Sequence, residues 1–168
     1  SHFIGRPGAV GQRAANFTQQ KSDWLLMLGA RMDMGQTGYM HKYLAPNAKK
    51  IMVDIDKIEV NRSNVTLDEK INCDASYFLK TLLRYLPSKI NLSDNWLKYC
   101  KNIRRKYPIV LEKFISQKKY VNSYYFVDTL SEVLSKKDTI VTDMGFSFTS
   151  THQAFKVKRG QTFYTNSG

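Results

Sequence analysis

The residue types best suited to chemistry lie between Thr139 and Thr151, in the run TIVTDMGFSFTST. The β-branched residues at its start are typical of a strand, which runs out at Asp143. A tight turn follows at Gly145, and a hydroxyl-rich run from Ser147 favours the opening of a helix. Open α/β sheets bind ligands where their strands end, and helix N-termini attract anions. This stretch is therefore a candidate phosphate site.

Three residues are the candidate contacts to such a phosphate: the backbone of Gly145, Phe146 and Ser147, together with the Ser147 hydroxyl. An ordinary strand-to-helix turn is the alternative interpretation of the same residues. His152 lies further along the predicted helix, where a lone histidine is more often packed or exposed than catalytic. The sequence contains no HExxH, GxSxG or Walker motif.

A second candidate site combines a glycine turn with acidic residues that end the next strand. The residues concerned are Gly29, Ala30, Arg31, Asp54 and Asp56. An acidic residue in this position often binds a ribose hydroxyl, so a nucleotide would suit the site. The sequence has no GxGxxG motif, and solvated carboxylates at a strand end are an equally good interpretation.

Alternating strands and helices must position these residues. The continuous apolar run Trp24–Leu28 predicts a strand buried on both faces, and shorter strands are predicted at 50–54, 71–73, 139–141 and 161–165. Helices are predicted at 9–20, around Glu59, at 75–86 with Asp74 as its cap, at 121–134 and at 146–155. Gly35–Gly38 and Tyr39–Ala48 are predicted to be loops. This order favours an α/β fold with doubly wound, mainly parallel sheets.

Residues 91–119 differ in being polar and basic, and they predict two helices bent at Pro108. The chain carries a net charge of +12, and the positive residues are densest between Lys98 and Lys119. A solvated helical face is the favoured interpretation, and a nucleic-acid site, which would bind DNA in a salt-dependent manner, is the alternative. We expect no nucleic-acid partner.

Composition limits the remaining classes of protein. Hydrophobic residues make up 42% of the 168 residues, which is enough for a packed core. Two cysteines, Cys73 and Cys100, form neither a disulfide framework nor a zinc pattern, so a cytoplasmic location is expected. No run approaches the ~20 apolar residues of a membrane helix, and no signal peptide is evident. The abrupt ends suggest a piece of a longer protein.

Longer stretches of the sequence resemble the acetolactate synthase-like branch of thiamine diphosphate-dependent enzymes. They are FIGRPGAVGQRAANFTQQKSDWLLMLGARMD, LAPNAKKIMVDIDKIEV, IVTDMGFSFTSTHQAF and TFYTNSG. The resemblance implies that residues 1–87 are the latter half of a Rossmann-like central domain. It also implies that residues 88–119 are a basic helical linker, and that residues 120–168 begin the C-terminal domain that binds the diphosphate.

The resemblance further implies an enzyme that uses thiamine diphosphate and Mg²⁺ to decarboxylate a 2-keto acid and transfer the resulting two-carbon or acyl unit. Such enzymes are homodimers or homotetramers of three-domain subunits. The activating glutamate and the GDG…N motif that binds Mg²⁺ match nothing in these 168 residues, so no catalytic or metal-binding residue is expected here. This stretch alone is expected to be inactive.

The same resemblance assigns Gly145, Phe146 and Ser147 to the thiamine diphosphate. Relatives often have Gln-His where this sequence has Phe146-Ser147, so the side-chain contacts differ while the backbone role is retained. In relatives that carry FAD, Gly29, Ala30 and Arg31 would face the flavin nucleotide, with Asp54 and Asp56 near its adenosine end. A non-catalytic nucleotide-binding or regulatory module is the alternative function.

Overall fold

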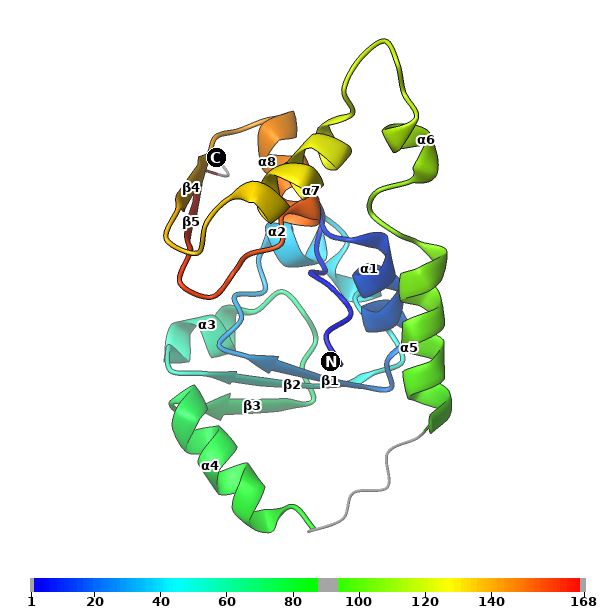
Figure 1. The fold of residues 1–168 in the computed structure, drawn as a ribbon. Helices are drawn as coiled ribbons and strands as arrows, with labels where there is room; N and C mark the ends of the chain where they lie inside the picture. The colour runs from blue at the N-terminus through cyan, green and yellow to red at the C-terminus, as the bar shows by residue number, and fades with distance from the viewer. Residues whose placement is uncertain (1, 88–93, 167–168) are drawn as a thin grey trace. The chain divides into compact units, whose positions relative to one another are not determined.

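The computed structural model describes residues 2–87 and 94–166 of the chain, which divides into two compact units (Figure 1). Unit 1 comprises Ser1–Ala9 and Arg13–Lys106. Unit 2 comprises Val10–Gln12 and Tyr107–Gly168. The domain boundaries expected from the sequence, at residues 87 and 119, stay predictions.

Unit 1 is built on three parallel strands in the order β1-β2-β3. They are β1 (Trp24–Leu28), β2 (Lys49–Asp54) and β3 (Glu69–Asn72). The register pairs Leu28 with Val53 and Asp54 with Asn72, so all three strands end at the same edge of the sheet. The predicted α/β class with parallel sheets is confirmed.

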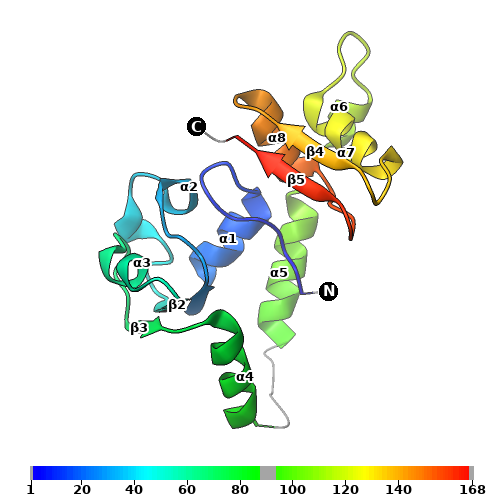
Figure 2. The same ribbon diagram turned by 90° about the vertical axis from the view of Figure 1, so that its left-hand side faces the viewer.

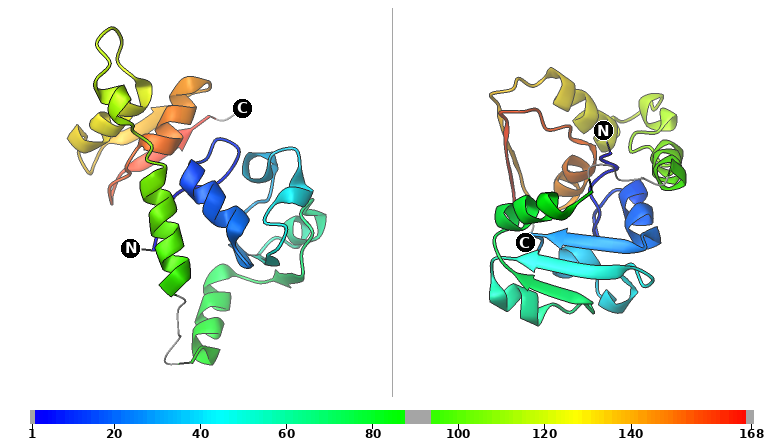
Figure 3. Two further views of the ribbon diagram at one scale, coloured as in Figure 1. Left: turned by 90° about the vertical axis from the view of Figure 1, so that its right-hand side faces the viewer. Right: turned by 90° about the horizontal axis from the view of Figure 1, so that it is seen from below.

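Helices in unit 1 lie before, between and after these strands. They are α1 (Arg13–Lys21), α2 (Met34–Thr37), the 3₁₀ helix η1 (His41–Tyr43), α3 (Lys57–Arg62), α4 (Ala75–Tyr85) and α5 (Asp94–Lys106). Helix α1 lies along α5, as Figures 2 and 3 show from two sides, while α3 and α4 contact β2. Helices α3 and α4 therefore both pack against the central strand of the sheet.

Several predicted boundaries in unit 1 were wrong. Helix α1 begins at Arg13 rather than Ala9, because the glycine-rich segment before it forms a turn. Strand β3 begins at Glu69, two residues before the predicted start. The Gly35–Gly38 segment contains a short helix, α2, because the Asp33 carboxylate accepts hydrogen bonds from the Gly35 and Gln36 N–H groups.

Burial in unit 1 is also lighter than the apolar pattern predicted. Trp24 in β1 is 49% exposed and only Met27 of that strand is buried, so the expected burial on both faces is not found. The core gathers instead around Met27, Met52 and Leu44. An apolar run indicates which residues can be buried, whereas the packing of the surrounding elements decides which of them become buried.

Unit 2 contains a two-stranded parallel sheet and three helices. The elements are α6 (Glu112–Ile115), α7 (Ser123–Val133), β4 (Thr139–Thr142), α8 (Phe146–Ala154) and β5 (Thr162–Thr165). Val127 of α7, Ile140 of β4 and the fully buried Phe155 form the core. The helix predicted to follow Asp143 and the strand predicted at 161–165 are therefore present.

The basic segment forms helices on both sides of Pro108, as predicted: α5 ends at Lys106 and α6 begins at Glu112. The predicted segment also includes residues 91–93, which lie outside the described residues. Among the described helices, none has the length and apolar character needed to cross a membrane.

Candidate functional site

The carboxyl ends of β4 and β5 meet at one edge of the unit 2 sheet. Asn166 N–H continues the ladder by donating to the Thr142 carbonyl at 3.1 Å. The Asn166 side chain then donates to the Asp143 carboxylate at 3.3 Å. This edge is the place where parallel sheets bind ligands, and it holds the residues singled out from the sequence.

Gly145 forms the turn from β4 into α8 with φ 82° and ψ −145°. Its positive φ is accessible to glycine and strained for other residues, and a Cβ built here would meet open space. Helix α8 starts at the next residue, without a side-chain cap. The first hydrogen bond of the helix runs from Thr149 N–H to the Gly145 carbonyl at 3.3 Å. The backbone N–H groups of the residues between them therefore have no acceptor within the helix. These groups and the helix dipole favour an anion.

The side chains of this turn are engaged within the protein. The Ser147 hydroxyl donates to the Asp143 carbonyl at 3.0 Å or the Met144 carbonyl at 3.1 Å. The Phe146 ring meets Tyr124 edge to face, with 5.6 Å between centroids. The turn therefore offers backbone donors to a ligand, while its hydroxyl proton is directed at the chain's own carbonyls.

Asp143 adds an exposed negative charge beside these donors. Its carboxylate accepts from Met144 N–H at 2.7 Å and from Asn166. A carboxylate beside a phosphate requires a cation between them, so the arrangement suits a phosphate bound together with a metal ion. Within the described residues, no three His, Cys, Asp or Glu side chains gather closely enough to hold a metal.

The second predicted site lies at the corresponding edge of the unit 1 sheet. Gly29 N–H donates to the Val53 carbonyl at 2.8 Å, which places the glycine turn beside the end of β2. The Asp54 carboxylate accepts from Asp56 N–H at 2.8 Å, and Asp56 caps α3 by accepting from Ile58 N–H at 2.7 Å. Both carboxylates are therefore used in local turns, although they remain at the edge where a nucleotide would lie.

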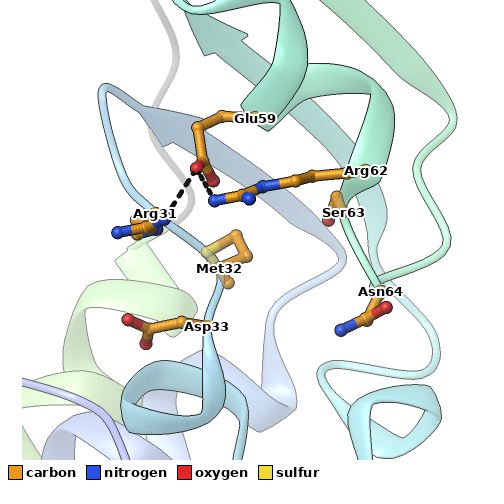
Figure 4. A pocket seen from close by; sticks show the side chains of 7 residues that line it. All are labelled: Arg31, Met32, Asp33, Glu59, Arg62, Ser63 and Asn64. Carbon is orange, nitrogen blue, oxygen red and sulfur yellow. Dashed lines mark hydrogen bonds and ion pairs between the residues drawn. The ribbon is translucent and has the colours of Figure 1, made fainter.

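A pocket of about 290 Å³ opens near this edge (Figure 4). It is lined by Arg31, Met32, Asp33, Glu59, Arg62, Ser63 and Asn64. Of the five residues predicted for a nucleotide, only Arg31 lines it. The Glu59 carboxylate lies between two guanidinium groups, 3.1 Å from Arg31 and hydrogen-bonded to Arg62.

Sequence analysis missed most of this pocket. Arg62 and Glu59 are three residues apart on α3, a spacing that brings side chains together on a helix and that could have drawn attention to them. Ser63 and Asn64 gave no signal. Of the lining residues, Asp33 also caps α2 by accepting from Gly35 N–H at 2.9 Å.

Comparison with known proteins agrees with this fold. Residues 1–82 match the family model for the central domain of thiamine pyrophosphate enzymes. A probable acetolactate synthase large subunit of Methanocaldococcus jannaschii is 32% identical over 98% of the chain and 28% of its own length. An acetolactate synthase of Mycobacterium leprae is 30% identical over 84% of the chain and 23% of its length. The acetolactate synthase isozyme 1 large subunit of Escherichia coli is 26% identical over 98% of the chain and 28% of its own length.

These matches confirm the resemblance recognised in the sequence. The first half of the chain is similar to the central domain of thiamine pyrophosphate enzymes, and most of its length is similar to acetolactate synthase large subunits. The chain spans about a quarter of the length of these relatives, since the matches cover 23% to 28% of each.

Proposed function

We propose that this chain is part of a thiamine diphosphate- and Mg²⁺-dependent enzyme that decarboxylates a 2-keto acid and transfers the resulting two-carbon or acyl unit. The observation that carries the proposal is the Gly145 turn at the carboxyl end of β4, where α8 begins without a side-chain cap. Similarity to thiamine pyrophosphate enzymes supports the class of cofactor. The substrate and the transfer step are part of the proposal.

The residues at this edge fit a diphosphate through the backbone. The N–H groups that follow Gly145 would donate to phosphate oxygens, because they precede the hydrogen-bonded ladder of α8. Asp143 would face the metal ion that accompanies the diphosphate. When bound, thiamine diphosphate provides a carbanion for addition to a keto carbon and an electron sink for the loss of CO₂. The residues of this chain would position the diphosphate and supply charge beside it.

Calorimetry on the complete protein tests the proposal. We expect thiamine diphosphate to bind in the presence of Mg²⁺, and Gly145→Ala to weaken binding about tenfold or more, because alanine at φ 82° costs ~1–3 kcal/mol of strain. Gly38→Ala is the matched control, since Gly38 also has a positive φ, 64°, and open space around a Cβ, but it ends α2 in unit 1 rather than opening α8. No heat of binding with the wild-type protein would refute the proposal.

A nucleotide in unit 1 is a second candidate function, favoured by the pocket that Arg31 and Arg62 line. The guanidinium groups would contact a phosphate or a ribose of a nucleotide, of which FAD is one. If thiamine diphosphate does not bind, we propose instead that the protein is a non-catalytic module that binds a nucleotide. The visible absorbance of the purified complete protein distinguishes flavin from other nucleotides.

The cellular setting is also part of the proposal. We place the protein in the cytoplasm, as a homodimer or homotetramer that acts on a small 2-keto acid. Cys73 and Cys100 are free thiols in the structure, as a reducing compartment favours. We expect neither nucleic acid nor membrane as a partner.

A further inference from the structure

Two glutamine side chains of unit 2 each donate a hydrogen bond to a backbone carbonyl of the other's segment. Gln12 Nε2 donates to the Gln153 carbonyl at 2.6 Å, and Gln153 Nε2 donates to the Val10 carbonyl at 2.9 Å. We call this pair the glutamine clasp. The Gln12 side chain is 8% exposed, so an amide there would be costly without these partners.

The clasp holds the C-terminal turn of α8, the helix whose first turn faces the proposed diphosphate. The inward side of α8 is formed by Ser150, Thr151 and Ala154, of which two are hydroxyl residues. Ser150 donates to the Phe146 carbonyl within the helix itself. Ala154 and the C-cap Phe155 anchor the end of α8 in the apolar core, while its other buried positions are polar, so directional hydrogen bonds supplement packing in setting its rotation and tilt.

A nine-residue helix behaves as a short rod of roughly 13 Å, at about 1.5 Å per residue. A change of tilt at Gln153 therefore displaces the N–H groups of Phe146 and Ser147 at the opposite end. Hydrogen bonds to an anion weaken steeply when donors turn away from it. The orientation of α8 thus decides whether these groups converge on a phosphate.

From this geometry we infer that Gln12 and Gln153 are positioning residues for thiamine diphosphate. They fix α8 so that its first N–H groups face the diphosphate, without contacting the cofactor themselves. The inference rests on the proposed function. Neither glutamine stood out in the sequence, because they are 141 residues apart and only the folded chain brings them together.

Methionine variants of the complete protein test the inference, since the methionine side chain is about as long as that of glutamine but has no N–H group to donate. We expect Gln12→Met and Gln153→Met each to raise the thiamine diphosphate Kd about tenfold, which is the effect of roughly one hydrogen bond. The double variant should be little weaker than either single variant, because the two bonds act together. Turnover at saturating cofactor should stay at the wild-type value.

Gln161→Met is the matched control. Gln161 also makes two side chain–backbone bonds in unit 2, to the Ser135 carbonyl and from Lys158 N–H, both at 2.8 Å, and neither bond involves α8. Its loss should lower stability as much as loss of the clasp and leave the Kd unchanged. An equal rise in Kd for Gln161→Met would overturn the positioning role.

Hydrogen exchange without cofactor separates this inference from the proposed function. We expect peptides covering residues 146–154 to exchange faster in Gln153→Met than in the wild type or in Gln161→Met. Unchanged exchange would overturn the clasp. If the wild-type protein binds no thiamine diphosphate, the proposed function fails and the positioning role fails with it, while faster exchange would still show that the clasp orients α8.

Discussion

Among single residues, Lys156 links the loop after α8 to α7 through two ion pairs. Its ammonium group lies 2.9 Å from the Asp128 carboxylate and 2.8 Å from that of Glu132. The hydrogen bond and charge of Lys156 lower the pKa of Glu132 below 4.5. The hydrogen bonds from Glu132 and Asp128 raise the pKa of Lys156 above 10.5. All three groups are substantially hydrated, so the effect on stability is small.

The pH dependence of this contribution has a definite sign. A lowered carboxyl pKa stabilises the fold above pH 4.5, and this is lost as pH falls through the folded pKa of Glu132. A raised ammonium pKa stabilises it below pH 10.5, and this is lost as pH rises through the folded pKa of Lys156. The difference in urea midpoint between wild type and Lys156→Gln should be constant at neutral pH and shrink at both extremes.

Lys137→Gln is the control for this measurement, because Lys137 is exposed and its backbone N–H, rather than its side chain, bonds to Ser135. Its urea midpoint should follow that of the wild-type protein across the pH range. A difference for Lys156→Gln that persists undiminished in acid would contradict the assignment.

Among the elements, α7 is fixed at both ends by side chains. The Asn122 side-chain oxygen accepts from Tyr124 and Tyr125 N–H at its start. At its end, the Lys158 ammonium donates to the Glu132 and Leu134 carbonyls at 2.7 and 2.6 Å, where the helix dipole favours a cation. Because α7 packs on β4 through Val127 and Ile140, these caps also support the strand that leads to Gly145.

Loss of the N-cap should therefore destabilise unit 2. We expect Asn122→Ala to cost about 1 kcal/mol of unfolding free energy, and Asn122→Ser to retain most of the stability because serine is also a good cap. Urea unfolding of the complete protein measures both. Equal losses for alanine and serine would show that the cap is not the source of the stability.

Helix α4 shows where a correct prediction of an element still misjudges its surroundings. Its leucine-rich pattern and the Asp74 cap located the helix to within one residue. No residue of α4 is buried among the described residues, and Leu83 is 69% exposed. The sequence pattern specifies an amphipathic helix, whereas burial depends on which elements come to lie against its apolar face.

For the molecule as a whole, both units present large apolar side chains at the surface. Leu83 of α4 and Val141 of β4, 73% exposed, are examples. Large exposed apolar side chains in such numbers suit surfaces that contact further protein. Since the chain spans about a quarter of the length of its relatives, the remainder of a complete subunit or a second subunit could occupy such faces.

Oligomeric state is the corresponding prediction. We expect the complete protein to sediment as a dimer or tetramer at micromolar concentration, and to keep that mass after gel filtration at high salt, because apolar contacts are not screened by ions. A single species at the monomer mass would contradict the proposed assembly.

The sequence by itself determined the local features of this protein. Strand β1, the start and end of α8, and the need for glycine at 145 follow from periodicity, capping and backbone sterics, which act within a few residues. The resemblance to thiamine diphosphate enzymes followed from the same stretches and is confirmed by the family match.

Only the tertiary structure decided how distant residues meet. It placed Glu59 between Arg31 and Arg62, and it joined Gln12 to Gln153. It also showed that the Ser147 hydroxyl donates to carbonyls of its own turn. Such contacts depend on rotamers and on strand register between separate segments, and no local preference specifies them. The Gly145 turn was foreseeable, but the clasp that orients its helix was not.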